Sequence, residues 1–470
     1  MPDLSALSAT ELPSLYGSGA LSPIEVARDA LTRIEHHEHQ VNAFVVRDPE
    51  RALAEAARSE ARWREKRPLG PLDGVPVTIK DNIAVGGWPM RRGSSLASDA
   101  PFPEDAPATA RLREAGAVIL GKTTMPEYGW KGVGDSPLTG ITRNPWNLAT
   151  GPGGSSAGAA VAAALNLGCL HIGTDGAGSV RIPAAFTGVV GFKPTYGRVP
   201  AWPLSTMGFL AHIGPLTRTV ADASLAFAAI GQPDARDMTA VLARPGGMER
   251  LTENGLRGLR VAWSPRLGFE VAVDPEVAQL TERAARAFEA LGATVEEADP
   301  GFPDPVDLLD AIWSAGAALA LRDIGPEERG HMDPGLVAVA ERGAGVSGMA
   351  YVDALLYRRG ELARAMARFH ERYDLLLTPT LPIPAFEVGR NTPAHGRYGA
   401  DWTAWTPFTY PFNLTQQPAI SVPCGLTQAG LPVGLQIVGP FGHDEQVLAA
   451  AAAYEAAHPF AAIAAPRGEV

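Results

Sequence analysis

Residues 173–195 read GTDGAGSVRIPAAFTGVVGFKPT, a glycine-rich loop followed by a helical segment and a short apolar strand. Glycine and serine lie together just where the helix is expected to begin. Glycines allow backbone N–H groups to approach a ligand closely, and the start of a helix carries partial positive charge. A second such loop, PGGSSAGAA at residues 152–160, also leads into an apolar helix. We therefore expect the two loops to bind an anion or a developing oxyanion.

Short apolar strands alternate with helical segments on both sides of these loops. VPVTIK at 75–80, AVILGK at 117–122 and VVGFKP at 189–194 predict buried strands, and residues 158–167 predict an apolar helix. The alternation continues toward the C-terminus, with strands expected at 259–263, 294–299, 375–380 and 419–423 and a helix at 275–291. Strands interleaved with helices predict an α/β fold with a mostly parallel or mixed sheet.

The chain contains no internal repeat, linker or low-complexity block, so we expect residues 1–470 to form one domain. A helix is predicted from a capping box, in which Ser22 is followed by proline and then by Glu25. The expected parts of the domain are N-terminal helices at about 1–66, the core at about 67–225, a helical and α/β elaboration at about 226–372 and a return to the core at about 373–470.

Residues 382–411 form a proline- and aromatic-rich loop that contains Trp402, Trp405, Phe408 and Tyr410. A loop of this length inside a compact domain is usually a lid or a wall of a binding site. The aromatic side chains could equally be packing that covers the core. The sequence leaves both interpretations open.

Composition excludes several classes of protein. The 51 acidic residues outnumber the 40 basic ones and the basic residues form no cluster, so we expect no nucleic-acid partner. Cys169 and Cys424 lack the spacing of a zinc site, which predicts a reduced, cytoplasmic protein without a structural metal. No secretory signal is visible, and the longest apolar stretch, residues 158–170, is too short to span a bilayer. We expect no membrane association.

Two residues are candidates for catalysis on chemical grounds: a serine as a nucleophile and a lysine as a base. Ser156 lies in a GxSxG pattern, which is typical of a nucleophile elbow, but the prolines and glycines before it argue against the strand that an elbow requires. Lys80 closes the apolar strand at 75–80, and only five of the 40 basic residues are lysines. Lysine can lose its proton when it is desolvated, whereas arginine cannot. Lys80 is therefore a candidate base, and the alternative is an ammonium paired with Asp81 or another carboxylate.

Three motifs in register resemble the amidase signature family: GVPVTIKDN around Lys80, GGSSAG around Ser155 and residues 173–195 around Ser179. The resemblance implies a large mixed β-sheet core covered on both sides by α-helices. It continues in GKTTMPEYGW at 121–130, TRNPWN at 142–147, NLTQQPAISVPCG at 413–425 and GLPVGLQIVGP at 430–440.

The resemblance implies a Ser-cisSer-Lys triad. Ser179 would be the nucleophile, Ser155 would relay its proton from a cis peptide bond after Gly154, and Lys80 would be the base. A lysine with an ordinary pKa of about 10.4 is charged at neutral pH, so burial would have to disfavour the ammonium.

The resemblance also implies an oxyanion hole and places it on the backbone N–H groups of Gly176, Ala177, Gly178 and Ser179. Many family members have glycine at position 177 and cysteine at position 187, where this chain has alanine and threonine. Both differences lie outside the triad. Trp130 and Gln417 are candidate substrate contacts, Trp130 for an apolar or aryl group and Gln417 for a polar one.

From this resemblance we expect an amidohydrolase that cleaves a carboxamide C–N bond through a serine acyl-enzyme. It would release a carboxylate and ammonia or an amine from a small, partly apolar or aryl substrate, with no metal or organic cofactor. Relatives are often dimeric, so a homodimer is the assembly that the family suggests.

Two alternatives use the same residues. The first is a hydrolase of carbamates or urea-like compounds, which present a similar carbonyl. The second is the glutaminase component of a tRNA-dependent amidotransferase, whose members commonly read GSxRQP and SLDQxGP. This chain has SVRIP at 179–183 and AHIGP at 211–215, as in stand-alone hydrolases. A free-standing amidohydrolase is therefore favoured.

Overall fold

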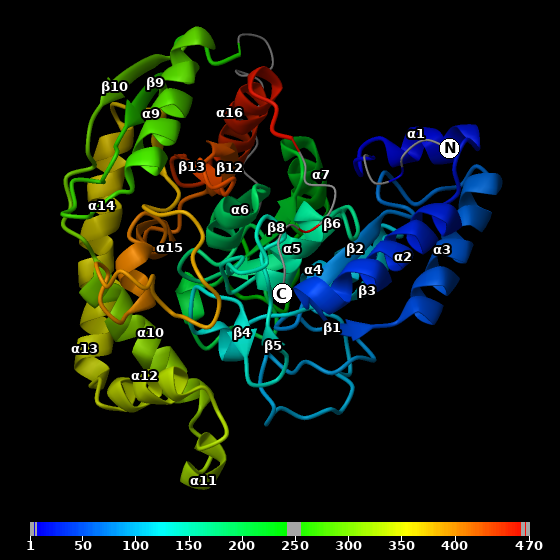
Figure 1. The fold of residues 1–470 in the computed structure, drawn as a ribbon, viewed down its shortest axis with the longest axis horizontal. Coiled ribbons are helices and arrows are strands. Elements are labelled where there is room, and N and C mark those ends of the chain that lie inside the picture. The colour runs from blue at the N-terminus through cyan, green and yellow to red at the C-terminus, as the bar shows by residue number, and fades with distance from the viewer. Residues whose placement is uncertain (1–3, 5–6, 242–254, 462–465, 467–470) are drawn as a thin grey trace.

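A computed structural model describes residues 4, 7–241, 255–461 and 466 of the chain. One mixed sheet of 11 strands runs through it in the order β1-β3-β2-β6-β8-β7-β12-β13-β11-β9-β10, with helices on both faces (Figure 1). The strands are β1 (Phe44–Arg47), β2 (Pro76–Lys80), β3 (Val118–Thr123), β6 (Leu170–Asp175), β7 (Val190–Lys193), β8 (His212–Thr217), β9 (Arg260–Trp263), β10 (Thr294–Glu297), β11 (Leu375–Pro379), β12 (Ala419–Leu426) and β13 (Pro432–Val438). A separate two-stranded sheet pairs β4 (Asp135–Ser136) with β5 (Gly140–Ile141).

The helices at the N-terminus cover one end of the sheet, and most of those after residue 300 cover the other (Figure 1). The α-helices are α1 (Leu12–Ser18), α2 (Pro23–Val41), α3 (Pro49–Arg64), α4 (Pro107–Glu114), α5 (Ala157–Ala164), α6 (Arg181–Thr187), α7 (Val220–Ile230), α9 (Pro275–Ala290), α10 (Val306–Ala320), α11 (Pro326–Arg329), α12 (Pro334–Ala344), α13 (Gly348–Asp353), α14 (Arg359–His370), α15 (Pro411–Leu414) and α16 (Asp444–Ala457). Shorter helical turns are η2 (Glu127–Gly129), η3 (Gly208–Leu210), η5 (Trp402–Trp405) and the π-helical η4 (Ala354–Arg358).

The sheet separates two hydrophobic cores. Successive residues of a strand point to opposite faces, so a strand buried on both sides contributes to both cores. In β3, for example, Val118 and Leu120 belong to one core and Ile119 to the other. The predicted α/β fold with a mixed sheet covered on both sides is therefore confirmed.

The register of three neighbouring strands positions the site. β2 is parallel to both β3 and β6, and Ile79 of β2 lies opposite Ile172 of β6. Lys80 therefore reaches the same sheet edge as Thr174 and Asp175, which end β6. The glycine-rich loop from residue 176 to residue 180 and α6 follow directly from that edge.

Most expected elements are present within a few residues of their predicted bounds. Ser22 and Glu25 form the predicted capping box at the start of α2. In the aromatic-rich loop at 382–411, the side chains of Trp402, Trp405, Phe408 and Tyr410 are all buried in the hydrophobic core. Their burial favours packing as the explanation for these aromatic residues.

Two expectations concern the chain as a whole. The division into the four parts given above stays a prediction, and residues 242–254 of the expected elaboration lie outside the described residues. Within the described part of the chain, no helix combines the length and the apolar character needed to cross a bilayer.

Candidate active site

Lys80 ends β2 with its amine completely buried among hydroxyl groups. Its Nζ lies 2.8 Å from Ser155 Oγ, 3.0 Å from Ser156 Oγ and 2.8 Å from Thr174 Oγ1. Burial lowers the pKa of Lys80 to about 7, and the carboxylate of Asp175 opposes this shift. The amine is thus held where its neutral form is accessible near neutral pH.

The alternative pairing of Lys80 with Asp81 does not occur. Asp81 instead pairs with Lys122 of β3, whose Nζ lies 2.9 Å from Asp81 Oδ1. Within the described residues, Lys80 has no carboxylate at ion-pair distance. The alternative of a salt-bridged ammonium at position 80 is therefore wrong for Asp81 and unsupported for any other described carboxylate.

The hydrogen bonds of the two adjacent serines differ. Ser156 Oγ donates to the Thr174 carbonyl at 3.0 Å, because a carbonyl can only accept. It therefore accepts from Lys80 Nζ and from the Thr174 N–H, at 3.0 and 3.2 Å. These contacts use the full bonding capacity of the Ser156 hydroxyl. Ser155 Oγ contacts Lys80 and also lines the cavity described below.

The backbone presents Ser155 to the cavity. The peptide bond between Gly154 and Ser155 is cis, as the family resemblance implies. Gly129 also lies close to this serine, because a Cβ added to Gly129 would be 3.1 Å from Ser155 Oγ. The loop at 128–129 therefore passes close to this hydroxyl, and a side chain at position 129 would crowd it.

Ser179 lies at the end of the glycine-rich loop, just before α6, and lines the same cavity as Ser155. Its carbonyl accepts from the Ser156 N–H at 3.1 Å, which ties the two serine-containing loops together. Gly176 and Thr174 also line this cavity. Lys80 thus contacts Ser155, and Ser155 and Ser179 line one cavity.

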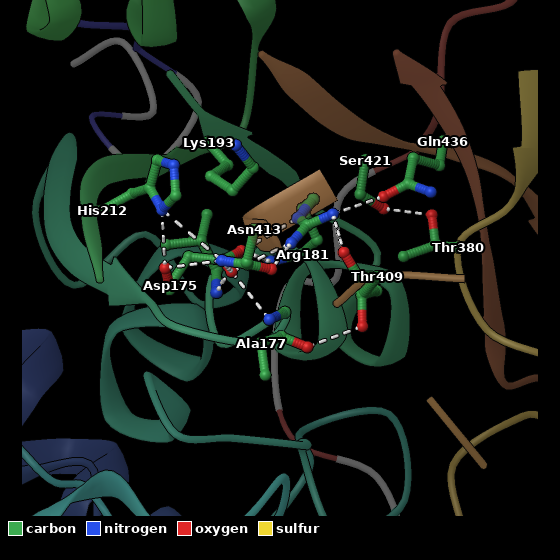
Figure 2. Close-up of polar contacts among 12 residues, drawn as sticks. Asp175, Ala177, Arg181, Lys193, His212, Thr380, Thr409, Asn413, Ser421 and Gln436 are labelled. Atoms are coloured by element: carbon green, nitrogen blue, oxygen red, sulfur yellow. Dashed lines mark hydrogen bonds and ion pairs between the residues drawn. The ribbon is translucent and has the colours of Figure 1, made fainter. Parts of the chain in front are cut away.

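A buried ion pair joins the two residues that flank the glycine-rich loop. The Asp175 carboxylate and the Arg181 guanidinium, both fully buried, lie at 2.9 Å. Burial alone would raise the pKa of Asp175, but the Arg181 guanidinium lowers it below its usual range. Arg181 also donates to the Thr409 carbonyl, to Gln436 Oε1 and to Asn413 Oδ1, as Figure 2 shows. A loop anchored in this way has little freedom to move.

The same carboxylate changes the expected set of oxyanion donors. The Gly178 N–H donates to Asp175 Oδ1 at 2.7 Å and is therefore already engaged. In the described part of the chain, the N–H groups of Gly176, Ala177 and Ser179 have no hydrogen-bond acceptor. The Ala177 carbonyl accepts from Thr409 Oγ1 at 2.7 Å, which fixes the peptide next to these groups (Figure 2).

The cavity in front of the serines has a largely apolar wall. This wall comes from the segment between β7 and β8 and from α10. Trp202 is held in place by Arg236, whose guanidinium lies 5.6 Å from its ring. The larger apolar lining residues are Val199, Trp202, Leu204 and Met207 of that segment, Trp313 of α10, Ile83 after β2 and Ile213 of β8.

Neither predicted substrate contact lines this cavity. Trp130 is buried, its carbonyl accepts from Trp313 Nε1, and its ring packs against Gly335. Gln417 is buried as well and hydrogen-bonds Thr415 Oγ1 and the Gly439 carbonyl. Residues 382–411 contribute nothing to the cavity lining either.

Several residues of the site escaped the sequence analysis. Thr174 contacts Lys80 directly, and its place just before Asp175 in the glycine-rich motif was a usable signal. Asn413, which joins Asp175 to Arg181, lies in the quoted NLTQQP motif. Trp313 is a single tryptophan in a helical region and carried no signal. Among the described residues, no group of three or more His, Cys, Asp or Glu side chains could hold a metal ion.

Comparisons with known proteins identify the family of this chain. The family model described as Amidase matches residues 25–448. An acylamidase of Rhodococcus erythropolis is 40% identical over 467 residues, which cover 97% of this chain and 96% of that protein. A glutamyl-tRNA(Gln) amidotransferase component of Symbiobacterium thermophilum is 36% identical, covering 96% of both chains. The solved structure of a bacterial aryl acylamidase of the amidase signature family superimposes with a TM-score of 0.87 at 32% identity, covering 96% of both chains. The chain therefore belongs to the amidase signature family.

Proposed function

We propose that this protein is a free-standing amidohydrolase that cleaves the C–N bond of a small, partly apolar or aryl amide through an acyl-enzyme on Ser179. The observation that carries this proposal is the buried Lys80 amine, which lies 2.8 Å from Ser155 and has hydroxyls instead of a carboxylate around it. An uncharged amine in this position can accept a proton, whereas an ion-paired ammonium cannot. Membership of the amidase family supports the reaction class.

In the proposed mechanism, neutral Lys80 draws a proton from Ser155, and Ser155 draws one from Ser179. The Ser179 oxygen then attacks the amide carbonyl and forms a tetrahedral intermediate. The proton returns through Ser155 to the leaving nitrogen, and the C–N bond breaks. Water enters, gives its proton to the same relay, and releases the carboxylate from Ser179.

The oxyanion of the intermediate would be held by backbone N–H groups of Gly176, Ala177 and Ser179. These groups are the ones in the loop that have no acceptor among the described residues. Gly178, which belongs to the same predicted set, would support the loop through Asp175 instead. A methyl group on Ala177 leaves its N–H available.

The apolar wall supports a substrate with an apolar or aryl part. Trp202, Met207 and Trp313 offer flat or flexible apolar surface to such a group. Two relatives are named for acylamidase and aryl acylamidase activity, and we extend this substrate class to the present chain. Carbamates stay an alternative, because the same nucleophile can attack their carbonyl.

The alternative of an amidotransferase glutaminase is less favoured. Amidotransferase relatives are similar over the full length of the chain. However, Ile182 and His212 stand where those proteins commonly have glutamine, and the second of these lines the cavity. We further propose a cytoplasmic enzyme that needs no cofactor, metal or nucleic acid. A homodimer stays a prediction.

The test is an assay of the purified chain alone with anilides, primary amides and carbamates, compared by kcat/KM. We expect release of an arylamine and a carboxylate, fastest for an anilide or another small apolar amide. A serine-directed covalent probe should label Ser179. Labelling of Ser156, or activity that appears only with a tRNA-binding partner, would contradict the proposal.

A further inference from the structure

The active-site cavity has a cationic side in addition to its apolar wall. Arg92 lies in the loop after β2, and its half-buried side chain lines the cavity. Its carbonyl accepts from the Tyr128 N–H at 2.7 Å, which ties it to the loop that passes Ser155. The backbone at Arg92 is thus anchored beside the reacting hydroxyls.

The guanidinium of Arg92 has no hydrogen-bond or ion-pair partner in the described part of the chain. Two carboxylates, Asp81 earlier in the same loop and Asp237 in the cavity lining, have other partners. Asp81 pairs with Lys122 at 2.9 Å. Asp237, which also lines the cavity, accepts from the Ala201 and Thr239 N–H groups, each at 2.8 Å. No described carboxylate pairs with Arg92, so its guanidinium is available to a group that enters the cavity.

Tyr128 is a polar neighbour of Arg92 in the cavity lining. Burial raises the pKa of the Tyr128 hydroxyl, and the Arg92 guanidinium, close to it, opposes the shift. Tyr128 also lines the cavity, so its hydroxyl and the guanidinium can contact the same ligand. A guanidinium presents parallel N–H donors that match the two oxygens of a carboxylate.

We propose that Arg92 binds a carboxylate carried by the substrate, so that the preferred substrate is an amide with an anionic group. This inference rests on the proposed amidohydrolase function and narrows its substrate class. The carboxylate could belong to the acyl half, as in the monoanilide of a dicarboxylic acid. It could also belong to the amine half, as in an acylated aminobenzoate. The chemistry at Arg92 is the same in both cases, and the experiment separates them.

The experiment uses two matched pairs of anilides, in which an isopropyl group replaces the carboxylate at nearly equal size. The acyl arm compares N-phenylsuccinamate with the anilide of 4-methylpentanoic acid. The amine arm compares 4-acetamidobenzoate with 4-isopropylacetanilide. The measured quantity is the ratio of kcat/KM for the charged substrate to that for its uncharged partner. This ratio cancels any general loss of activity in a variant.

In the wild-type protein we expect the ratio to favour the carboxylate by about tenfold to one-hundredfold in one arm. Arg92→Gln should bring that ratio close to one, and Arg92→Lys should keep part of it. Arg91→Gln is the matched control, because Arg91 pairs with Asp99 and does not line the cavity. The preference should weaken as ionic strength rises.

A wild-type ratio near or below one in both arms would overturn the proposal, as would a ratio that Arg92→Gln leaves unchanged. If the wild-type protein hydrolyses neither the four anilides nor any amide or carbamate of the panel above, the proposed function fails instead. Binding of the two carboxylates to Ser179→Ala, with and without Arg92→Gln, then decides this inference. Tighter binding with Arg92 present supports it, and equal binding refutes it.

Discussion

Two buried lysines at the ends of neighbouring strands have opposite surroundings. Lys80 ends β2, Lys122 lies near the end of β3, and neither side chain is exposed to solvent. Lys80 contacts three hydroxyls, whereas Lys122 contacts the Asp81 carboxylate at 2.9 Å and two backbone carbonyls. Burial lowers the pKa of both amines, and for Lys122 the adjacent carboxylate opposes this. Burial alone therefore does not make a lysine a base; the absence of a contacting counter-charge matters as well.

The strand register explains why Asp81 serves the other lysine. Lys122 lies opposite Ile79, while Lys80 lies opposite Thr123, after a shift in register between Val77 and Thr78. Paired residues share a face of the sheet and adjacent residues do not. Lys122 therefore shares a face with Ile79 and with Asp81, two residues further on, and Lys80 points to the opposite face.

The largest effect on activity is expected for the proposed nucleophile, Ser179. Ser179→Ala removes the proposed nucleophile and should lower kcat by at least about 10⁴-fold. The thermal unfolding midpoint should stay within a few degrees of the wild-type value, since the change removes one hydroxyl. Turnover at more than one-hundredth of the wild-type rate in a folded variant would remove Ser179 from the mechanism.

Lys80→Met should lower kcat by about 10²- to 10⁴-fold while the protein stays folded. The proposed base acts in its neutral form, and burial lowers the pKa of Lys80 to about 7. The rate should therefore fall as the pH drops below about 7 and level off above it. A rate–pH profile measured with an uncharged anilide checks this. A rate that does not change between pH 6 and 8 would contradict the assignment of Lys80, unlike Lys122, as a base.

Lys122→Met should act on stability instead. It leaves the buried Asp81 without its cation, and removing one partner of such a pair typically costs about 3–5 kcal/mol. Chemical denaturation measures this loss in the free energy of unfolding. The double variant Asp81→Asn, Lys122→Met should recover part of it, because no unpaired charge remains. A Lys122→Met protein as stable as the wild type would contradict the structural role.

Thr409→Val should have the smallest effect. It removes the hydrogen bond to the Ala177 carbonyl and keeps the shape of the side chain. The loss of one such bond costs about 1 kcal/mol, so kcat should fall by roughly three- to tenfold as the glycine-rich loop loosens. Steady-state kinetics with one anilide are sufficient, and an unchanged kcat would show that this contact does not position the loop.

The helices and strands that were predicted have local signals in the sequence. The helix expected at 275–291 is α9, Pro275–Ala290, and the strand expected at 75–80 is β2. β8 was missed, since its centre contains Gly214 and Pro215, which normally punctuate a turn. A Cβ at Gly214 would lie 2.0 Å from the Phe192 carbonyl oxygen. Glycine is needed there for contact with a neighbouring strand, which a single-sequence pattern does not reveal.

The motifs alone were enough to point to the reaction class and to Lys80, Ser155 and Ser179. Short motifs specify chemistry because they combine a reactive side chain with the glycines that expose the backbone beside it. Trp130 and the aromatic residues of 382–411 were conspicuous for another reason: they fill the core. Aromatic side chains serve packing and recognition equally well, so composition could not separate the two roles.

Only the folded arrangement assigned the counter-charges and the cavity lining. Asp81 is next to Lys80 in the chain, yet it pairs with Lys122 across the sheet. Arg92 and Trp313 meet at one cavity although they lie in different halves of the chain. Coulomb and desolvation energies depend on distances through space and on the packing of every neighbouring segment. For this reason short sequence motifs were enough to identify the proposed reactive residues, whereas their charge states and the shape of the pocket depend on the whole fold.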